Sequence, residues 1–211
     1  MKILIADDHP IVRNGIKQII SDISESYSID EAEDANEVVQ KVSRNDYDFI
    51  ILDISMPKGG GLFALEQIKR IKPQTKVLIL SIFNNEQYIF RAMNAGASGY
   101  LTKASATEEL GLSIEKILSG RKYFSSEIIE KMATVLNSDF EKPKHDNLSE
   151  REFQIFCLLA QGKTTKEIAI ELFISPKTVS TYYYRILNKM EMEKNSEIIH
   201  YAIKNGLIDT P

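Results

Sequence analysis

Short apolar runs alternate with amphipathic helical stretches over roughly the first 118 residues. The runs that predict strands are KILIA (2–6), YSIDEA (27–32), FIILD (49–53), KVLILS (76–81) and GYLTK (99–103). Helical patterns begin near Pro10, Asn36, Leu62, Asn84 and Thr107. Because several strands are apolar throughout, as in a sheet covered on both faces, the pattern predicts an α/β doubly wound five-stranded parallel sheet.

The strand pattern stops near Gly120, and the remainder of the chain reads as helical. A short helix is predicted after Ser125 and Ser126, and residues 137–147 (NSDFEKPKHDN) have the polar composition of a tether. From Leu148 onward, four helical segments with tight connections predict a small all-α four-helix domain. We therefore expect one domain over 1–120, a linker with room for a short helix over 121–147, and a second domain over 148–211.

Charge and cysteine content narrow the class of protein. Residues 1–120 hold 13 Lys/Arg against 17 Asp/Glu, whereas residues 121–211 hold 13 of each, so any contact with nucleic acid belongs to the second half. Cys157 is the only cysteine, which excludes an intramolecular disulfide and fits a reducing compartment. The N-terminus lacks the apolar core of a signal peptide and no stretch is long enough to span a membrane, so a cytoplasmic protein is predicted.

Polar side chains follow four of the predicted strands. Asp7 and Asp8 come after the first strand, Asp53 after the third, Ser81 after the fourth and Lys103 after the fifth. In open α/β sheets ligands collect at the carboxyl ends of the strands, so these groups are expected to converge. Three gathered carboxylates repel one another unless a cation lies among them, and Mg²⁺ is the hard oxygen-bound cation that suits such a site.

A site of this kind can transfer a phosphoryl group. Asp53 would act as the carboxylate nucleophile, while Mg²⁺ and Lys103 neutralise charge on the transferring oxygens. Each residue alone has an ordinary explanation, since Asp after a strand is often a turn or helix-cap residue and a lysine is usually a solvated surface charge. Their joint occurrence at four strand ends favours the phosphoryl-transfer interpretation.

The first half of the chain resembles the receiver domain of two-component response regulators, a flavodoxin-like fold. The matching segments are ILIADDHPIVRNGI, DFIILDISMPKGGGL, LILSIF and GASGYLTK. The resemblance implies that Asp53 is the phosphoacceptor, supplied by a sensor histidine kinase or a small phosphodonor. It also implies that Asp8 and Asp53 ligate Mg²⁺ directly, with the Ser55 backbone carbonyl as a third ligand and Asp7 acting mostly through water.

The same resemblance makes Ser81 and Tyr100 a switch pair, in which the hydroxyl moves onto the phosphoryl group and the ring turns inward. Two positions depart from the family. Ile82 is bulky where receivers usually have a small residue, and it is expected to alter phosphorylation or dephosphorylation rates. Ala104 stands where proline is common; if the preceding bond is cis, as in many relatives, it carries a strain of roughly 3 kcal/mol. His9 is interpreted as a loop residue before Pro10 rather than a metal ligand.

Residues 176–190, PKTVSTYYYRILNKM, predict a helix with two unlike faces. Val179, Tyr183, Ile186 and Met190 form an apolar stripe, which makes Tyr183 a core residue, and Tyr182 lies at its boundary. The opposite arc holds hydroxyls, an amide and cations, and the helix contains no Asp or Glu: Lys177, Thr178, Ser180, Thr181, Tyr184, Arg185, Asn188 and Lys189. A solvated face of an ordinary bundle is the plainer explanation. The missing acids, in an acidic chain, favour a DNA-reading helix-turn-helix.

Residues 148–190 resemble the LuxR/NarL-type helix-turn-helix family. By that likeness Ser180, Thr181 and Tyr184 reach base edges. The residues expected to hold phosphates are Lys166, Lys177, Thr178, Tyr182, Arg185 and Lys189. The last helix commonly forms the dimer contact in the family, here through Ile198, Ile199, Ala202 and Ile203, although packing within the monomer explains these residues equally well. Tyr184 departs from the family pattern and leaves the target sequence open.

Together the two halves predict a phosphorylation-controlled transcription factor of the NarL/FixJ type that binds promoter DNA, as a homodimer, and is not an enzyme. One alternative is a Mg²⁺-dependent phosphatase with an aspartate nucleophile. The order of acids disfavours it, because in the haloacid dehalogenase type the nucleophile lies in a D-x-D after the first strand. Another alternative is a protein-interaction module whose helix-turn-helix no longer binds DNA.

Overall fold

The computed structural model describes residues 1–24, 26–82, 84, 86–136, 143–205 and 207–208. The chain forms two compact units, residues 1–137 and residues 138–211, and each unit is described by itself. All peptide bonds between described residues are trans. This includes the bond between Lys103 and Ala104, which is cis in many proteins of the family that the sequence resembles.

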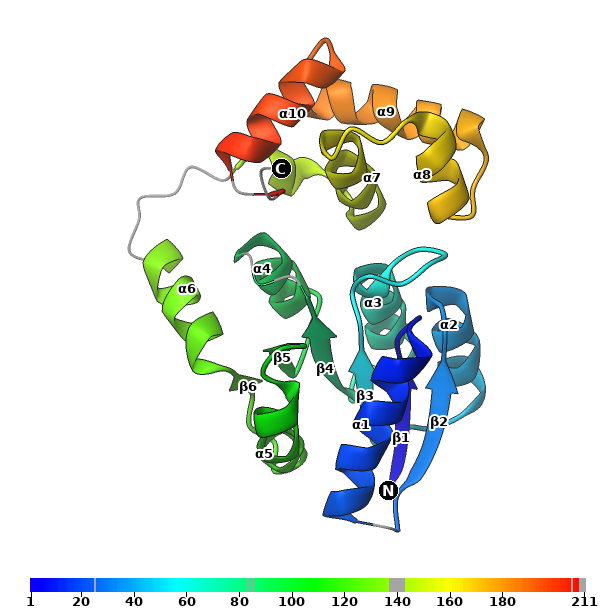
Figure 1. Cartoon of the computed structure of the whole chain (residues 1–211), viewed down its shortest axis with the longest axis vertical. Helices are drawn as coiled ribbons and strands as arrows, with labels where there is room; N and C mark the ends of the chain where they lie inside the picture. The colour runs from blue at the N-terminus through cyan, green and yellow to red at the C-terminus, as the bar shows by residue number, and fades with distance from the viewer. Residues whose placement is uncertain (25, 83, 85, 137–142, 206, 209–211) are drawn as a thin grey trace. The chain divides into compact units, whose positions relative to one another are not determined.

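The first unit is built on one parallel sheet, shown in Figure 1. Its strands are β1 (Lys2–Ala6), β2 (Ser28–Ala32), β3 (Phe49–Leu52), β4 (Lys76–Ser81), β5 (Gly99–Thr102) and β6 (Tyr123–Phe124). They are ordered β2-β1-β3-β4-β5-β6. The predicted five-stranded doubly wound sheet is confirmed. The short sixth strand was not predicted, because two residues are too few to show any periodicity.

Helices cover both faces of this sheet (Figure 1). They are α1 (Pro10–Ile23), α2 (Ala35–Arg44), α3 (Gly61–Ile71), α4 (Glu86–Asn94) and α5 (Ala106–Leu118). A further helix, α6 (Ser126–Leu136), follows β6 and contacts α4. On one face, Ile16 and Ile20 of α1 and Leu110 and Ile114 of α5 pack in one cluster with side chains from β1, β3, β4 and β5. The central strands β1 and β3 are thereby buried on both sides, which explains their uninterrupted apolar sequences.

The second unit is entirely helical. It contains η1 (Lys144–Asn147), α7 (Glu150–Ala160), α8 (Thr165–Glu171), α9 (Pro176–Met190) and α10 (Asn195–Lys204). Reciprocal side-chain and backbone bonds of Ser149 with Glu152 and of Thr164 with Glu167 start α7 and α8. Ser175 caps α9 by accepting from the Thr178 amide, just before Pro176. The predicted all-α four-helix domain is confirmed.

Within the part of the chain that the structure describes, every helix is too short or too polar to cross a membrane.

The core of the second unit is aromatic at its centre: Phe153 and Phe156 stack with ring centroids 6.4 Å apart, and Tyr201 meets Phe156 edge-on. The buried His145 of η1 lies 2.9 Å from the Tyr201 hydroxyl through Nδ1. The residues just before α7 are thus fastened to α10.

We predict that Gly99→Ala lowers the free energy of unfolding by about 1–3 kcal/mol, the usual range for overpacking a core. A Cβ at Gly99 would lie 2.5 Å from the carbonyl oxygen of Tyr123 and 2.9 Å from Ile117 Cδ1, so β5 and β6 would have to separate. Urea-induced unfolding of the full chain measures the change.

Gly15→Ala is the matched control, because Gly15 lies on the surface of α1 with no other atom within 4 Å of an added Cβ. There the substitution should stabilise the protein by up to about 1 kcal/mol through higher helix propensity. Equal effects of the two substitutions would contradict the packing described for β5.

Candidate functional site

The polar side chains predicted to converge do meet at the carboxyl end of the sheet. The Asp53 amide donates to the Ala6 carbonyl at 2.9 Å, which places Asp53 beside the end of β1. The Lys103 amide donates to the Ser81 carbonyl at 2.8 Å, which places Lys103 beside the end of β4. The parallel register therefore brings residues far apart in the sequence to one edge.

Lys103 links two of the acids. Its Nζ lies 2.7 Å from Asp53 Oδ2 and 2.6 Å from Asp7 Oδ2, and both carboxylates are buried. Burial raises the pKa of Asp53, and this outweighs the opposing influence of Lys103. Burial acts to lower the pKa of Lys103, but its bonds to the two carboxylates leave that pKa raised. The lysine is therefore held in its charged form.

The acid pair forms a tight turn with His9. The His9 amide donates to Asp7 Oδ1 at 2.8 Å, and the imidazole Nδ1 lies 2.8 Å from Asp8 Oδ1. One ligand atom from each of Asp7, Asp8 and His9 lies within 4.8 Å of the other two. His9 occupies the N-cap position of α1, as a loop residue before Pro10, and its ring lies beside the two acids.

Apart from Asp7 Oδ2 and Asp8 Oδ1, which lie in ion pairs with Lys103 and His9, two oxygen atoms at the site are buried without a hydrogen-bond donor from any described residue: Asp53 Oδ1 and Ser55 Oγ. An uncompensated carboxylate oxygen beside two further acids is unfavourable by itself. A hard divalent cation with oxygen ligands relieves that cost, so the donor set fits Mg²⁺ or a similar ion. The acidic cluster is thus of the kind typical of magnesium sites.

The turn between β3 and α3 packs directly against Asp53. Lys58, Gly59 and Gly60 have φ values of 58°, 130° and 81°, which brings the chain back over the end of β3. A Cβ on Gly61 would lie 1.9 Å from the Asp53 backbone oxygen, so only glycine fits there. This close approach helps to fix the backbone of the central carboxylate.

Ser81 and Tyr100 lie on adjacent strands and are both buried. A side-chain hydrogen bond between them lowers the pKa of Tyr100, but burial raises it more strongly, so the phenol stays protonated. The ring of Tyr100 points inward in this structure. Ile82, in contrast, is 67% exposed.

Arg13 is a residue of the site that the sequence pattern did not reveal. Its guanidinium is buried and donates to the Asp7 carbonyl oxygen, to Glu31 and to Glu33, each at 2.8 Å. An arginine on the second turn of the helix that follows the acid pair was the available signal. It was not decisive, because its partners on β2 and just beyond it depend on the register of the sheet.

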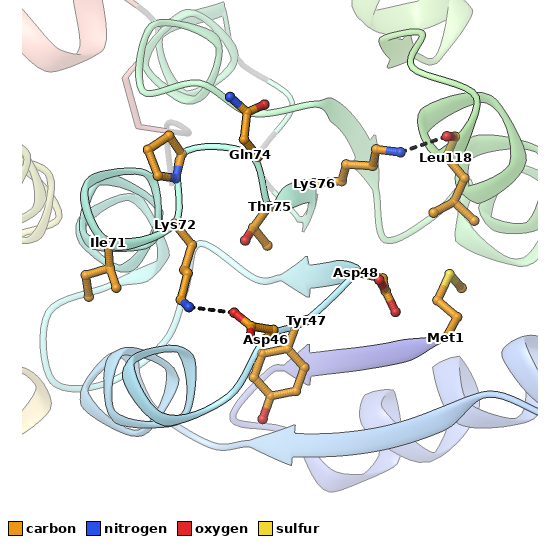
Figure 2. Close-up of a pocket in the computed structure, with 11 residues that line it drawn as sticks. Met1, Asp46, Tyr47, Asp48, Ile71, Lys72, Gln74, Thr75, Lys76 and Leu118 are labelled. Carbon is orange, nitrogen blue, oxygen red and sulfur yellow. Dashed lines mark hydrogen bonds and ion pairs between the residues drawn. The ribbon is translucent and has the colours of Figure 1, made fainter.

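A second concavity lies at the opposite, amino end of the strands, shown in Figure 2. It has a volume of about 700 Å³ and is lined by residues from the starts of β1, β3 and β4. Its lysines are engaged, because Lys72 pairs with Asp46 at 2.5 Å and Lys76 donates to the Leu118 carbonyl at 2.7 Å. None of the residues predicted to be functional lines it.

In the second unit, α9 presents the predicted polar face. The residues on it that are exposed or half-buried are Lys177, Thr178, Ser180, Thr181, Tyr182, Tyr184, Arg185 and Lys189. Val179, Ile186 and Met190 are buried as the helical wheel indicated. Tyr183 is only half-buried and meets Tyr184 edge-on at 5.6 Å, so its assignment to the core was wrong. Tyr184 itself is 66% exposed.

Local bonds restrict several of these side chains. Ser180 and Thr181 donate to backbone carbonyls one turn earlier, at 3.0 Å each. Arg185 lies over the Tyr182 ring at 5.8 Å. Lys189 pairs with the buried Glu152 at 2.6 Å, an ion pair that the sequence did not reveal. Lys166, on α8, is exposed.

The four residues of α10 considered for a dimer contact separate into two groups. Ile198 and Ala202 are completely buried, so the alternative of packing within the monomer applies to them. Ile199 is half-buried and Ile203 is 42% exposed. Of the four, only these last two reach the surface.

Comparison with known protein families agrees with this geometry. Residues 3–115 match the response regulator receiver domain, and residues 146–202 match the bacterial regulatory proteins of the luxR family. The chain is 36% identical to the oxygen regulatory protein NreC of Staphylococcus haemolyticus, covering 99% of this chain and 100% of NreC. It is also 36% identical to the response regulator UvrY of Escherichia coli K12, covering 98% and 95%.

Solved structures give the same picture. RcsB from Salmonella enterica serovar Typhimurium, bound to promoter P1flhDC in the presence of the phosphomimetic BeF₃⁻, is 25% identical with a TM-score of 0.62, covering 99% of each chain. A structure of two RcsB dimers bound to two parallel DNAs is 26% identical with a TM-score of 0.63, covering 96% of this chain and 98% of RcsB.

We predict that, without divalent cations, Asp53→Asn raises the free energy of unfolding at pH 7 by about 1 kcal/mol, because it removes a buried charge. The folded-state pKa of Asp53 is raised, so the wild-type carboxylate destabilises the fold above the unfolded pKa of about 4. The advantage of the variant should therefore be absent at low pH, grow as pH rises through the raised pKa, and then level off. Chemical unfolding in EDTA at several pH values measures it.

Asp46→Asn serves as the control, since the Asp46 side chain is 88% exposed in its pair with Lys72. Exposed ion pairs are screened by solvent and contribute little to stability, so little change is expected. A stability difference between Asp53→Asn and wild type that stays constant with pH would contradict the buried-charge explanation.

Proposed function

This chain belongs to the two-component response regulators of the NarL/FixJ family, which join a receiver domain to a LuxR-type DNA-binding domain, and on that premise we propose that phosphorylation of Asp53 controls promoter binding. The family consists of transcription factors rather than enzymes, which decides against the phosphatase alternative. The observation that carries the proposal is the Asp53 carboxylate, buried with Oδ2 on Lys103 and Oδ1 accepting no hydrogen bond from the described residues.

In the proposed step, Asp53 Oδ1 attacks the phosphorus atom of a phosphohistidine on a sensor kinase. An O–P bond forms, the P–N bond breaks, and the histidine leaves with the electron pair and is protonated by solvent. Lys103 faces the developing negative charge on the transferring oxygens. Asp8, Asp53 and the Ser55 carbonyl would hold Mg²⁺, with Asp7 acting through water, and the bound ion would neutralise phosphoryl oxygens. Ser81 and Tyr100 would respond to the new group as a switch pair.

We predict that the wild-type chain incubated with acetyl phosphate and Mg²⁺ acquires one acid-stable, alkali-labile phosphate, located at Asp53 by mass spectrometry. Asp53→Asn should acquire none, because no carboxylate remains to attack. Asp46→Asn, with its altered residue at the other end of the sheet, should be labelled like wild type. Phosphate found elsewhere in the wild-type chain would overturn the assignment.

For the second unit, we propose that α9 enters the major groove of DNA. Ser180, Thr181 and Tyr184 would face base edges, while the surrounding cations and hydroxyls hold phosphates. The exposure of Lys177 and Arg185 supports this arrangement. Lys189 could join them only by leaving Glu152, so its contribution should be smaller. The structure of two RcsB dimers bound to DNA supports binding as a homodimer.

We predict that Lys177→Ala/Arg185→Ala weakens DNA binding and makes the slope of log K against log salt less steep by about 2 per protomer, as expected for two lost phosphate contacts. Fluorescence anisotropy on DNA selected from a random pool measures both quantities. Lys204→Ala, an exposed lysine of α10, is the control and should bind like wild type. Unchanged binding by the double variant would favour the protein-interaction alternative.

The proposal also includes a sensor histidine kinase as the partner and the cytoplasm as the location of the protein. The kinase partner follows from the family, in which a sensor histidine kinase supplies the phosphoryl group. Cell fractionation would test the location. Phosphotransfer from candidate kinases, compared with Asp53→Asn, would identify the partner.

A further inference from the structure

Arg13 is the one cation that contacts the backbone of the acid pair among the described residues. Its side chain is 7% exposed, and each of its three nitrogens donates to a different acceptor at 2.8 Å: Nη1 to the Asp7 carbonyl, Nε to Glu31 and Nη2 to Glu33. A planar guanidinium with three bonds has little freedom to move.

The carbonyl that Arg13 holds belongs to the peptide group joining Asp7 to Asp8. Because a peptide group is planar, fixing its oxygen also fixes the amide of Asp8 and the position of the Asp8 Cα from which the second carboxylate extends. The His9 amide bond to Asp7 Oδ1 closes the other side of the turn. The orientation of both acids thus depends on a residue that touches neither carboxylate.

Charge alone does not explain Arg13 at this position. Its positive charge is balanced locally by Glu31 and Glu33, and Glu31 also pairs with Lys17 at 2.6 Å. The local group therefore carries two positive and two negative charges, and its net field at the acid pair is small. What remains specific to Arg13 is the bond to the carbonyl.

We propose that Arg13 is a positioning residue for cation binding, which holds the Asp7–Asp8 peptide so that both carboxylates face the ion. The inference rests on the proposed function, since it takes Mg²⁺ as the ion. Removing a residue that hydrogen-bonds to a metal ligand typically changes metal affinity by about 10–100-fold. A residue that merely fastened α1 to β2 would change stability without changing affinity.

The test is calorimetric titration of Mg²⁺ into the unphosphorylated full chain, which needs no phosphodonor. Arg13→Gln should weaken Mg²⁺ binding by about 10-fold, at the lower end of the range for such residues. The sign is diagnostic: removing a cation while leaving Glu31 and Glu33 would by Coulomb attraction strengthen binding, so weaker binding reports lost geometry. Lys17→Gln is the matched control, because it also removes a cation from Glu31 but leaves the Arg13–Asp7 bond in place.

Thermal unfolding of each variant accompanies the titration. If Arg13→Gln does not fold, Arg13→Lys replaces it, because it keeps the charge but cannot make three bonds in one plane, and weaker binding is again expected. Unchanged or tighter Mg²⁺ binding by the folded variant, or an equal loss in Lys17→Gln, would overturn the inference alone. If wild type and Asp8→Asn bind Mg²⁺ equally poorly, the proposed function itself fails at the metal site.

Discussion

The candidate site of the first unit depends on bringing like charges together at one edge of a sheet. Asp7 and Asp8 directly follow β1, and Asp53 directly follows β3. Both strands are buried on both faces, so the apolar core fixes their register despite the repulsion between the carboxylates. Lys103, from a third strand, relieves part of the repulsion by bridging Asp7 and Asp53. The relief is incomplete, and the remaining repulsion between the carboxylates favours a cation at this edge, which is what the proposed function requires.

Because the site is buried, a chemical change at Asp53 would also affect the side chains packed next to it. A phosphoryl group on Asp53 would place new acceptor oxygens near the ends of β4 and β5, where Ser81 and Tyr100 already share a hydrogen bond inside the protein. A hydroxyl has a single proton, so a strong hydrogen bond to the phosphoryl group would weaken or replace the bond between these two side chains. In a close-packed interior, a rearrangement of this kind shifts the protein between discrete conformations.

The sequence predicted what depends on strand order and apolar runs. The convergence of Asp53, Ser81 and Lys103 follows from parallel topology alone, because the carboxyl ends of all strands share one edge. It could not predict contacts that depend on how separate elements pack. The ion pair of Lys189 with Glu152 joins α9 to α7, and neither this pair nor the half-exposure of Tyr183 can be read from a helical wheel.

The second unit shows why phosphorylation and assembly are linked in this proposal. The exposed cations of α9 are few, since Lys189 is engaged with Glu152 and only Lys177 and Arg185 remain exposed without an ion pair in the described part of that helix. A few phosphate contacts from one helix give weak, strongly salt-dependent binding. Joining two such helices on adjacent half-sites multiplies their affinities, so under the proposed function a modest change in dimerisation by the receiver would become a large change in promoter occupancy.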